Sequence, residues 1–433
     1  MKEYIYTDRP PERVVLVGVQ LAGQEPAAVA LAELERLVEA ADGTPVDSIY
    51  QIREAPDPRT FVGKGKVEEI KEIVKNTKAE LVVFDCNLSP SQSRHLEDEL
   101  QARIVDRTEL ILDIFARRAR TRAARVQVEL AQLEYLLPRL TKRWTHLERT
   151  EGAIGARGPG ETQLETDRRL VRNRIEHLKD DLRSIEARRE REATAHDGFF
   201  RVSLAGYTNA GKSSLLNALT GSNAYVADRL FATLDTKTRL WTLADKRRVL
   251  LSDTVGFVKR LPHDLVASFH ATLAESIHAD LLLVVVDASR PDAEECLAAV
   301  EETLRDVEAL APRLYVFNQI DRVHNSMDVS ILERPGRACV RVSALTGAGI
   351  VNLDRAVSRI LDEGTVVGEV VASAADGRTL AELRRSGIVI NEGYVDNEWR
   401  ARMRFRRALY GRLLQLKAHG AIRAAFDGME GTG

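Results

Sequence analysis

The sequence has few of the features that define secreted, zinc-binding or membrane proteins. Three cysteines occur in 433 residues, at isolated positions: Cys86, Cys296 and Cys339. This excludes a disulfide framework, and Cys and His do not cluster at the spacing of a structural zinc site. No apolar run exceeds six residues, as in Leu281–Val286, whereas a membrane-spanning helix needs roughly 20. The first residues lack the apolar core of a secretory signal, so we expect a cytoplasmic protein without a membrane partner.

The whole chain has no large excess of positive or negative charge, but two of its segments are strongly basic. The 63 Lys+Arg residues nearly balance the 65 Asp+Glu residues, which leaves a formal net charge of -2. Between Arg117 and Arg149 there are nine Arg or Lys against three Glu, and between Arg400 and Arg423 there are eight and no acid. Such segments are candidate contacts with a polyanion. Solvated faces of a helix and a strand are the more common explanation of either run alone.

The length favours roughly two to four domains, and residues 1–118 have the pattern of a small α/β domain. Four apolar strand candidates alternate there with helix-like stretches: Val14–Val19, Ser48–Ile52, Leu81–Asp85 and Arg103–Val105. Ser89 and Asp106 each stand three residues before Gln or Glu, which marks two helix starts. Residues 61–66, FVGKGK, could hold a phosphate, but a loop that enters a helix is the favoured interpretation.

Residues 119–196 contain two helical stretches with the same apolar spacing of 4, 3, 4, 3. The first has Val126, Leu130, Leu133, Leu137 and Leu140, and the second has Val171, Ile175, Leu178, Leu182 and Ile185. Each stripe needs a partner to leave water, which favours an antiparallel hairpin. Its tip would be the glycine-rich residues 152–160, after which Thr162 and Glu165 form a capping box. Separate packing of each helix on a neighbouring domain also fits the pattern.

Residues 197–364 and 365–433 are predicted to form two further domains. In the first, strand candidates alternate with helices: Phe199–Ala205, Val249–Ser252, Leu281–Val286, Leu314–Phe317 and Val340–Val342. This order predicts a mostly parallel, doubly wound sheet. The second reads as strand, helix, strand, strand, helix, a small α+β domain. In its third strand, Trp399, Ala401, Met403 and Phe405 alternate with arginines, so one face is expected to pack and the other to be cationic.

One motif between an apolar strand and a helix carries specific chemistry. It fits the phosphate-loop pattern G-x-x-x-x-G-K-[ST] with Gly206, Tyr207, Thr208, Asn209, Ala210, Gly211, Lys212 and Ser213, and Ser214 follows it. The glycines let backbone amides turn toward phosphate oxygens, while Lys212 reaches the β and γ phosphates and the Ser213 hydroxyl binds Mg²⁺. Chance produces this pattern in roughly 1 to 2% of chains of this length, so we predict a nucleotide site.

Three shorter motifs follow strands in the order that a GTPase needs. They are Asp253, Thr254, Val255 and Gly256; then Asn318, Gln319, Ile320 and Asp321; and then Ser343, Ala344 and Leu345. The Asp253 carboxylate can hold Mg²⁺ through water, and the Gly256 amide can meet the γ-phosphate. The Asp321 carboxylate can accept from N1–H and the exocyclic amine of guanine, a donor pair that adenine lacks at that edge. A backbone amide of residues 343–345 can reach the guanine oxygen, so GTP is the predicted nucleotide.

A switch loop is expected between the phosphate loop and Asp253. It contains Phe231, Ala232, Thr233, Leu234 and Asp235. Thr233 is the best candidate to complete the Mg²⁺ shell when the γ-phosphate is bound; Thr236 and Thr238 are rivals, and a structural threonine also fits. In this scheme the catalytic residues are Lys212, Thr233 and Gly256, and the metal is held by Ser213, Thr233 and Asp253.

Strings along nearly the whole chain resemble the HflX family of ribosome-associated GTPases, within the translation-factor-like P-loop GTPases. They span residues 61–70, 107–122, 127–140, 158–169, 206–219, 230–235 and 253–258. The hairpin strings are the more specific ones, because many families share the GTPase motifs. The resemblance implies binding to the large ribosomal subunit, with the hairpin tip near the rRNA of the peptidyl-transferase region. It also implies the splitting or rescue of stalled ribosomes under stress.

Several positions modify this expectation. Gln319 stands where the guanine motif usually has Lys, whose stem covers the base, and Ala153 replaces a usual glycine in the tip. Phe257 stands where Ras-type enzymes place a water-orienting Gln; because Phe cannot polarise water, slow intrinsic hydrolysis that a partner accelerates is implied. Asn209 lies where potassium-activated GTPases coordinate the ion, so K⁺ is a candidate cofactor beside Mg²⁺. The alternative, that Asn209 simply braces the loop, is the favoured interpretation of this residue alone.

Two classes of function stay open on the residues alone. The leading hypothesis is an enzyme, a monomeric GTP-hydrolysing switch whose hairpin and basic surfaces engage ribosomal RNA. The alternative is an RNA-binding ribosome-assembly module in which GTP only gates attachment. Turnover with and without ribosomes separates these two. A membrane or protease regulator is a third idea, but no amphipathic anchor or lipidation signal supports it.

Overall fold

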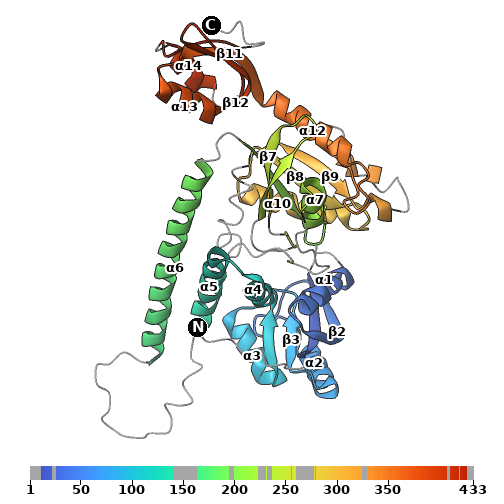
Figure 1. Ribbon diagram of the computed structural model, residues 1–433. Coiled ribbons are helices and arrows are strands. Elements are labelled where there is room, and N and C mark those ends of the chain that lie inside the picture. The colour runs from blue at the N-terminus through green and yellow to red at the C-terminus, as the bar shows by residue number, and fades with distance from the viewer. Residues whose placement is uncertain are drawn as a thin grey trace.

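The described part of the chain contains three β-sheets and their helices (Figure 1). The computed structural model describes residues 11–21, 26–140, 163–194, 199–222, 231, 237–254, 256–259, 277, 279–323, 329–330, 332–334, 336–406, 410–418 and 420–426. The N-terminal, middle and C-terminal sheets follow one another along the molecule. The predicted fold class, a multidomain α/β protein with a hairpin and a small C-terminal α+β part, is confirmed.

The N-terminal sheet has four parallel strands in the order β2-β1-β3-β4. Its elements are β1 (Arg13–Leu21), α1 (Ala27–Ala40), β2 (Thr44–Arg53), α2 (Lys64–Thr77), β3 (Leu81–Phe84), α3 (Pro90–Leu100), β4 (Arg103–Asp106) and α4 (Arg107–Arg118). All four strand predictions are confirmed. Ser89 forms a capping box with Gln92, and the Asp106 carboxylate caps α4. Residues 61–66 enter α2, with Gly63 at its N-cap, as the favoured interpretation expected.

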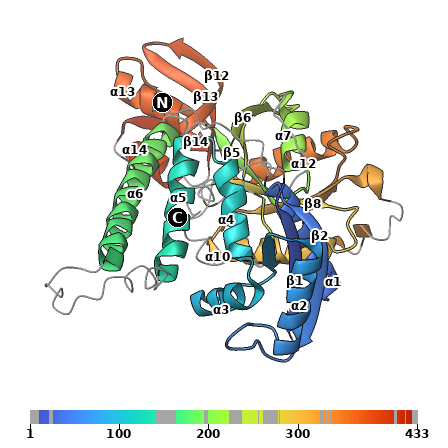
Figure 2. The ribbon, with the colours of Figure 1, turned by 90° about the horizontal axis from the view of Figure 1, so that it is seen from below.

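Two helices form the predicted antiparallel hairpin (Figures 1 and 2). α5 (Arg122–Leu136) continues into the 3₁₀ turn η1 (Leu137–Arg139), and α6 (Gln163–Thr194) runs back beside α5. The apolar seam between them includes the buried residues Val126, Leu130, Ile175 and Leu178. The helical prediction was wrong at Leu140, because Pro138 lacks an amide hydrogen and ends the α-helix before it. The tip, residues 152–160, lies outside the described residues, as does Thr162.

The middle sheet has six strands in the order β10-β9-β8-β5-β7-β6. Its elements are β5 (Phe200–Gly206), α7 (Lys212–Thr220), β6 (Lys237–Thr242), β7 (Arg248–Asp253), β8 (Leu281–Asp287), α10 (Ala293–Asp306), β9 (Arg313–Asn318), η3 (Ile320–Arg322), β10 (Cys339–Arg341) and α12 (Ile350–Glu363). β6 is antiparallel to β7, and the other neighbours are parallel. Sequence analysis missed β6, because its side chains are mostly exposed and form no apolar run.

The C-terminal sheet is antiparallel, in the order β12-β13-β11-β14. Its elements are β11 (Thr365–Ser373), α13 (Gly377–Ser386), β12 (Gly387–Val395), β13 (Glu398–Arg406), α14 (Tyr410–Ala418) and β14 (Ile422–Phe426). The alternation in β13 is confirmed: its apolar residues are buried, whereas Arg400 and Arg402 are exposed. The predicted element order was incomplete, since β14 follows α14. A strand of five residues gives only a weak pattern in the sequence, and β14 forms by pairing with β11.

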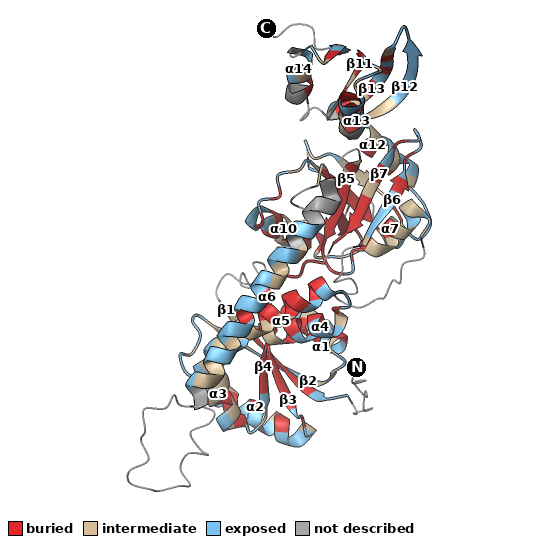
Figure 3. Cartoon of the chain, turned by 60° about the vertical axis from the view of Figure 1, so that its left-hand side comes forward, coloured by how far each residue is buried: buried red, intermediate tan, exposed pale blue. Residues whose placement is uncertain are grey.

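One apolar core joins the N-terminal and middle parts of the molecule. Buried residues of α1, α4 and α5 belong to the same cluster as residues of the phosphate loop, β8 and α10. The C-terminal sheet has a core of its own. Figure 3 shows buried residues concentrated in the strands and on α4 and α5, while much of α6 is exposed. Among the described helices, none combines the length and the apolar character that crossing a bilayer requires.

Candidate functional site

The phosphate-loop residues lie between the end of β5 and the start of α7. Gly206 has a φ angle of 155°, and a Cβ atom there would lie 2.3 Å from the carbonyl oxygen of Val285 in β8. Gly211 has a φ angle of 87°, and its Cβ would lie 2.3 Å from Nδ2 of Asn318. No side chain fits either place, which explains why the sequence has glycine at both.

Lys212 is the buried cation of this loop. Its Nζ donates to the carbonyl oxygens of Tyr207, at 2.9 Å, and Gly206, at 3.1 Å. Burial lowers the pKa of the Lys212 ammonium to about 8, against the raising effect of Asp253. Burial makes the charged form of this ammonium unfavourable. A phosphate beside it would restore the electrostatic stabilisation that the ammonium loses when it leaves water.

Ser213 and Asp253 meet although they lie on different elements. The Ser213 hydroxyl at the start of α7 donates to Oδ2 of Asp253, at the end of β7, over 2.6 Å. Asp253 is fully buried, and the hydroxyl of the next residue, Thr254, donates to the Leu204 carbonyl oxygen. A hydroxyl and a carboxylate side by side are hard oxygen donors, the type that Mg²⁺ prefers. The donor set therefore fits the expected metal.

Asn318 connects three of the predicted motifs. Its side-chain amide donates to the carbonyl oxygen of Ala210 at 2.9 Å, and its side-chain oxygen accepts from the Ala344 amide at 3.0 Å. Asn318 is buried, so these bonds hold the phosphate loop and the segment after β10 at fixed positions. Gln319 adds a 3.3 Å bond from its side-chain amide to the carbonyl oxygen of Asn209.

The predicted guanine-binding residues lie beyond this junction. Asp321 is exposed within η3, whereas Ile320 before it is half-buried. Ser343 is buried, and its hydroxyl accepts from the Thr346 amide; Leu345 is largely exposed. The structure thus brings the phosphate loop, Asp253, Asn318 and residues 343–345 to the same end of parallel strands. This end is where ligands bind in open α/β sheets.

The segment after Asp253 is attached to the phosphate loop. The Thr208 amide donates to the Phe257 carbonyl oxygen at 2.7 Å, and the Phe257 amide donates to the Gly206 carbonyl oxygen at 3.1 Å. A Cβ at Gly256 would lie 2.7 Å from Cγ2 of Thr208 and 3.1 Å from Nζ of Lys212. Gly256 therefore passes directly over the loop. The Phe257 ring is buried in the core shared by the two parts, away from solvent.

Part of the predicted switch loop lies outside the described residues: Ala232, Thr233, Leu234, Asp235 and Thr236, as well as Val255. Phe231 is described and buried, and its ring meets that of Phe115 in α4 edge to face, with 4.6 Å between centroids. The rival Thr238 lies in β6, with its hydroxyl 2.9 Å from that of Ser252. It belongs to the pairing of β6 with β7.

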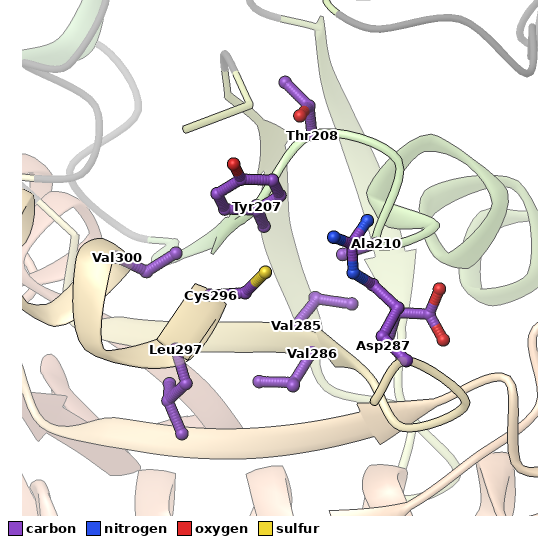
Figure 4. A pocket seen from close by; sticks show the side chains of 10 residues that line it. Tyr207, Thr208, Ala210, Val285, Val286, Asp287, Cys296, Leu297 and Val300 are labelled. Carbon is purple, nitrogen blue, oxygen red and sulfur yellow. The ribbon is translucent and has the colours of Figure 1, made fainter. Parts of the chain in front are cut away.

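A small cavity lies behind the phosphate loop (Figure 4). Side chains of β8 and α10 line it together with the loop, among them Val285, Cys296 and Val300. Its volume of about 10 Å³ has room for about one water molecule. Burial raises the pKa of the Cys296 thiol to about 12, so the thiol is protonated and unreactive at neutral pH. This cavity is part of the packing, distinct from the nucleotide site.

Sequence analysis missed two polar residues that reach the site from the N-terminal part. Glu33 of α1 contacts Tyr207, and Arg107 of α4 contacts Lys259. No spacing in the sequence relates Glu33 to Tyr207, which lie 174 positions apart. The only local signal was the helix start at Asp106, and that signal concerned capping.

Comparison with known proteins agrees with this geometry. Three family models match the chain: "GTP-binding GTPase N-terminal" over residues 28–116, "GTP-binding GTPase Middle Region" over 118–195, and "50S ribosome-binding GTPase" over 201–319. Together these matches extend over most of the chain. The third contains the phosphate loop, Asp253 and Asn318.

Curated relatives are similar over most of their length. The chain is 48% identical to the GTPase HflX of Escherichia coli K12 over 356 residues, which is 81% of this chain and 83% of the relative. It is 42% identical to the GTPase HflX of Caldanaerobacter subterraneus over 389 residues, 89% of each. A solved structure of a complex of SsGBP and GDP covers 81% of this chain and 99% of its own, at 23% identity and a TM-score of 0.46. The identity to the two curated relatives shows that the chain is a GTP-hydrolysing enzyme that belongs to the HflX family.

Proposed function

We propose that the chain is a GTP-driven switch of the cytoplasm that binds the large ribosomal subunit and splits or rescues stalled ribosomes under stress. The observation that carries the proposal is that Asn318 bonds to the phosphate loop and to Ala344, in a chain that also forms a helical hairpin. In this proposal the protein acts as a monomer. Its domains are residues 1–118, 119–196, 197–364 and 365–433, and the tip of the second lies near rRNA of the peptidyl-transferase region.

Within the proposed site, each motif has one task. The phosphate-loop amides and Lys212 bind the β and γ phosphates, and the Gly256 amide senses the γ-phosphate. Asp321 reads the guanine edge, and a backbone amide of residues 343–345 meets the guanine oxygen. The contact of Ser213 with Asp253 supports Mg²⁺ binding there, with Thr233 as the third ligand. Bound at this place, Mg²⁺ would neutralise charge on the phosphate oxygens.

Slow intrinsic turnover is part of the proposal. Phe257 is buried and carries no group that could orient water, so the residues of the proposed site bind and position GTP more than they activate the attacking water. A partner that completes the site would raise turnover. The large subunit is the proposed partner, and the description of the family model over residues 201–319 supports that choice.

Two measurements test this function. Co-sedimentation with separated ribosomal subunits should show binding to the large subunit with a GTP analogue and weaker binding with GDP. GTP turnover should rise when large subunits are added. Binding without any rise in turnover would favour the assembly module that uses GTP only to gate attachment. Binding to the small subunit alone would contradict the proposal.

A further inference from the structure

The N-terminal part of the molecule touches three segments around the nucleotide site. Oε2 of Glu33 in α1 accepts from the hydroxyl of Tyr207 in the phosphate loop at 2.7 Å. Arg107, the first residue of α4, donates through Nη2 to the carbonyl oxygen of Lys259 at 2.9 Å. Phe115, two turns further along α4, packs on Phe231 of the switch loop. One face, formed by α1 and α4, thus meets the phosphate loop and both flanking switch segments.

The polar part of this contact is a buried charge cluster. The Arg107 side chain is 4% exposed, and its two terminal nitrogens lie 2.5 Å from Asp85 and 2.5 Å from Glu33. Burial lowers the pKa of the Arg107 guanidinium, but Asp85 and Glu33 more than offset this effect, so its pKa is raised and the charge stays. Buried paired charges of this kind tolerate little displacement, because each separated charge would lose its compensation.

The Tyr207 side chain connects this charge cluster to the nucleotide site. Its hydroxyl accepts from the Lys259 amide at 3.0 Å while donating to Glu33. The Tyr207 side chain therefore joins the phosphate loop to the segment that follows Gly256. Burial, followed by the Glu33 charge, raises the pKa of the Tyr207 phenol, so the hydroxyl stays protonated as the donor that this arrangement needs.

The residue before Arg107 makes a matching contact with the hairpin. Asp106 is fully buried, and its Oδ2 accepts from Nη2 of Arg139 at 3.1 Å and from the Leu88 amide at 3.1 Å. The Arg139 guanidinium also lies over the Tyr135 ring, 3.5 Å from its centroid. Arg139 ends η1, next to the segment that leads into the predicted tip. Figure 2 shows α4 and α5 side by side, and the two helices contact each other.

We propose that Glu33 and Arg107 are positioning residues of the GTPase, and that the β4–α4 junction joins them to the hairpin through Asp106 and Arg139. Asp106, which bonds to Arg139, directly precedes Arg107 in the chain. In this proposal a displacement of Arg139 therefore shifts Arg107 and, with it, Lys259 and Tyr207. The first half of the proposal concerns hydrolysis by the protein alone. The second half rests on the proposed ribosomal function.

The first experiment measures intrinsic turnover of the full chain. Glu33→Gln and Arg107→Lys keep size or charge but weaken the bonds to Tyr207 and Lys259. We expect kcat to fall about 5- to 10-fold, the equivalent of a typical buried hydrogen bond, with KM changed less than about 2-fold. Glu99→Gln is the matched control, because Glu99 forms an exposed ion pair with Arg59 in the same part of the chain. Rates are divided by the number of GDP-binding sites, so loss of folded protein does not count.

A double variant distinguishes positioning from general loosening. If Glu33 acts through the Tyr207 hydroxyl, Glu33→Gln combined with Tyr207→Phe should lower kcat no more than the stronger single change. Additive losses would overturn the assignment, and so would kcat values equal to wild type in Glu33→Gln and Arg107→Lys. Neither result depends on ribosomes.

The second experiment tests the connection to the hairpin with purified large subunits. Without ribosomes no partner displaces residue 139, and Lys keeps the positive charge beside Asp106, so Arg139→Lys should keep intrinsic turnover. The variant should also keep co-sedimentation but lose most of the stimulation, roughly 10-fold. Arg174→Lys is the control, since Arg174 forms an exposed pair with Glu129 on the same hairpin. Stimulation of Arg139→Lys equal to wild type would overturn the connection. Loss of co-sedimentation would overturn it too, because Arg139 would then act in attachment. If wild type itself shows no stimulation, the proposed function fails, while the first experiment still decides the roles of Glu33 and Arg107.

Discussion

Lys212, a residue of the proposed nucleotide site, lowers the stability of the fold because its ammonium is buried. Burial lowers the pKa of its ammonium from 10.5 to about 8, so the folded chain releases this proton at a lower pH than the unfolded chain does. Below pH 8 the buried charge destabilises the fold fully, and the cost declines as pH rises from about 8 toward 10.5. This is the common compromise between stability and function at binding sites.

This cost predicts the behaviour of Lys212→Met. In nucleotide-free protein the variant should exceed wild type in free energy of unfolding by about 1 to 3 kcal/mol at pH 7, and the difference should shrink at pH 9.5. Other groups titrate in this range in both proteins, so only the difference is interpreted. Urea unfolding at pH 7, 8.5 and 9.5 measures it. A difference that is independent of pH would contradict the lowered pKa.

Asp321 is expected to decide which base is bound. Asp321→Asn should weaken GTP binding by roughly 10- to 100-fold, because a charged acceptor for two guanine donors is lost. The same variant should gain affinity for xanthosine triphosphate, in which a carbonyl replaces the amine. Competition binding with both nucleotides measures the switch. Unchanged GTP affinity would place guanine recognition elsewhere.

Asn209 is the residue on which a potassium requirement would depend. It has a φ angle of 64° within the phosphate loop, and its carbonyl oxygen accepts from Gln319. If K⁺ binds there, GTP turnover should be several-fold higher in KCl than in NaCl at equal ionic strength, because a correctly placed cation stabilises developing charge. Asn209→Ala should remove the difference. Equal rates in both salts, with and without ribosomes, would mean that Asn209 only braces the loop.

At the scale of elements, a replacement of the hairpin tip should separate intrinsic from partner-dependent GTP hydrolysis. Replacing residues 152–160 by a Gly/Ser linker of equal length leaves α5, α6 and all nucleotide motifs intact. Intrinsic hydrolysis should therefore be nearly unchanged, whereas stimulation by large subunits and any subunit splitting should fall sharply. Turnover with and without ribosomes measures both. Full ribosomal activity of the linker variant would make the tip a connector and direct attention to the arginine face of β13.

Elements with a strong local period were predictable, and elements without one were not. The heptad seam of α5 and α6 and the alternation of β13 arise from the side-chain geometry of a single helix or strand. β6 and β14 have no comparable pattern, because β6 is mostly exposed and β14 is short. Each exists through pairing with a neighbour, β7 for the first and β11 for the second.

At the scale of the molecule, the shared core predicts how the chain unfolds. Phe115 is 2% exposed and packs against Phe231 across the two parts, so Phe115→Ala should lower the free energy of unfolding of both together, by about 3 to 5 kcal/mol. Phe405→Ala should affect the C-terminal sheet, which has a separate core. Hydrogen exchange of the N-terminal and middle sheets measures the effect. Weakened protection in one of them alone would contradict a common unit.

The sequence by itself determined which nucleotide chemistry is proposed for this protein. The phosphate loop and the short motifs that contain Asp253, Asn318 and Asp321 are each contiguous in the chain. The function proposed for each motif depends on backbone conformation and residue type within a few positions. Only the tertiary structure decided that Asn318 bonds to Ala210 and Ala344, and that Glu33 reaches Tyr207. These contacts join positions that lie far apart in the chain, and they form only when packing of separate elements removes both partners from water. No local pattern encodes that proximity, since each partner alone resembles an ordinary polar side chain.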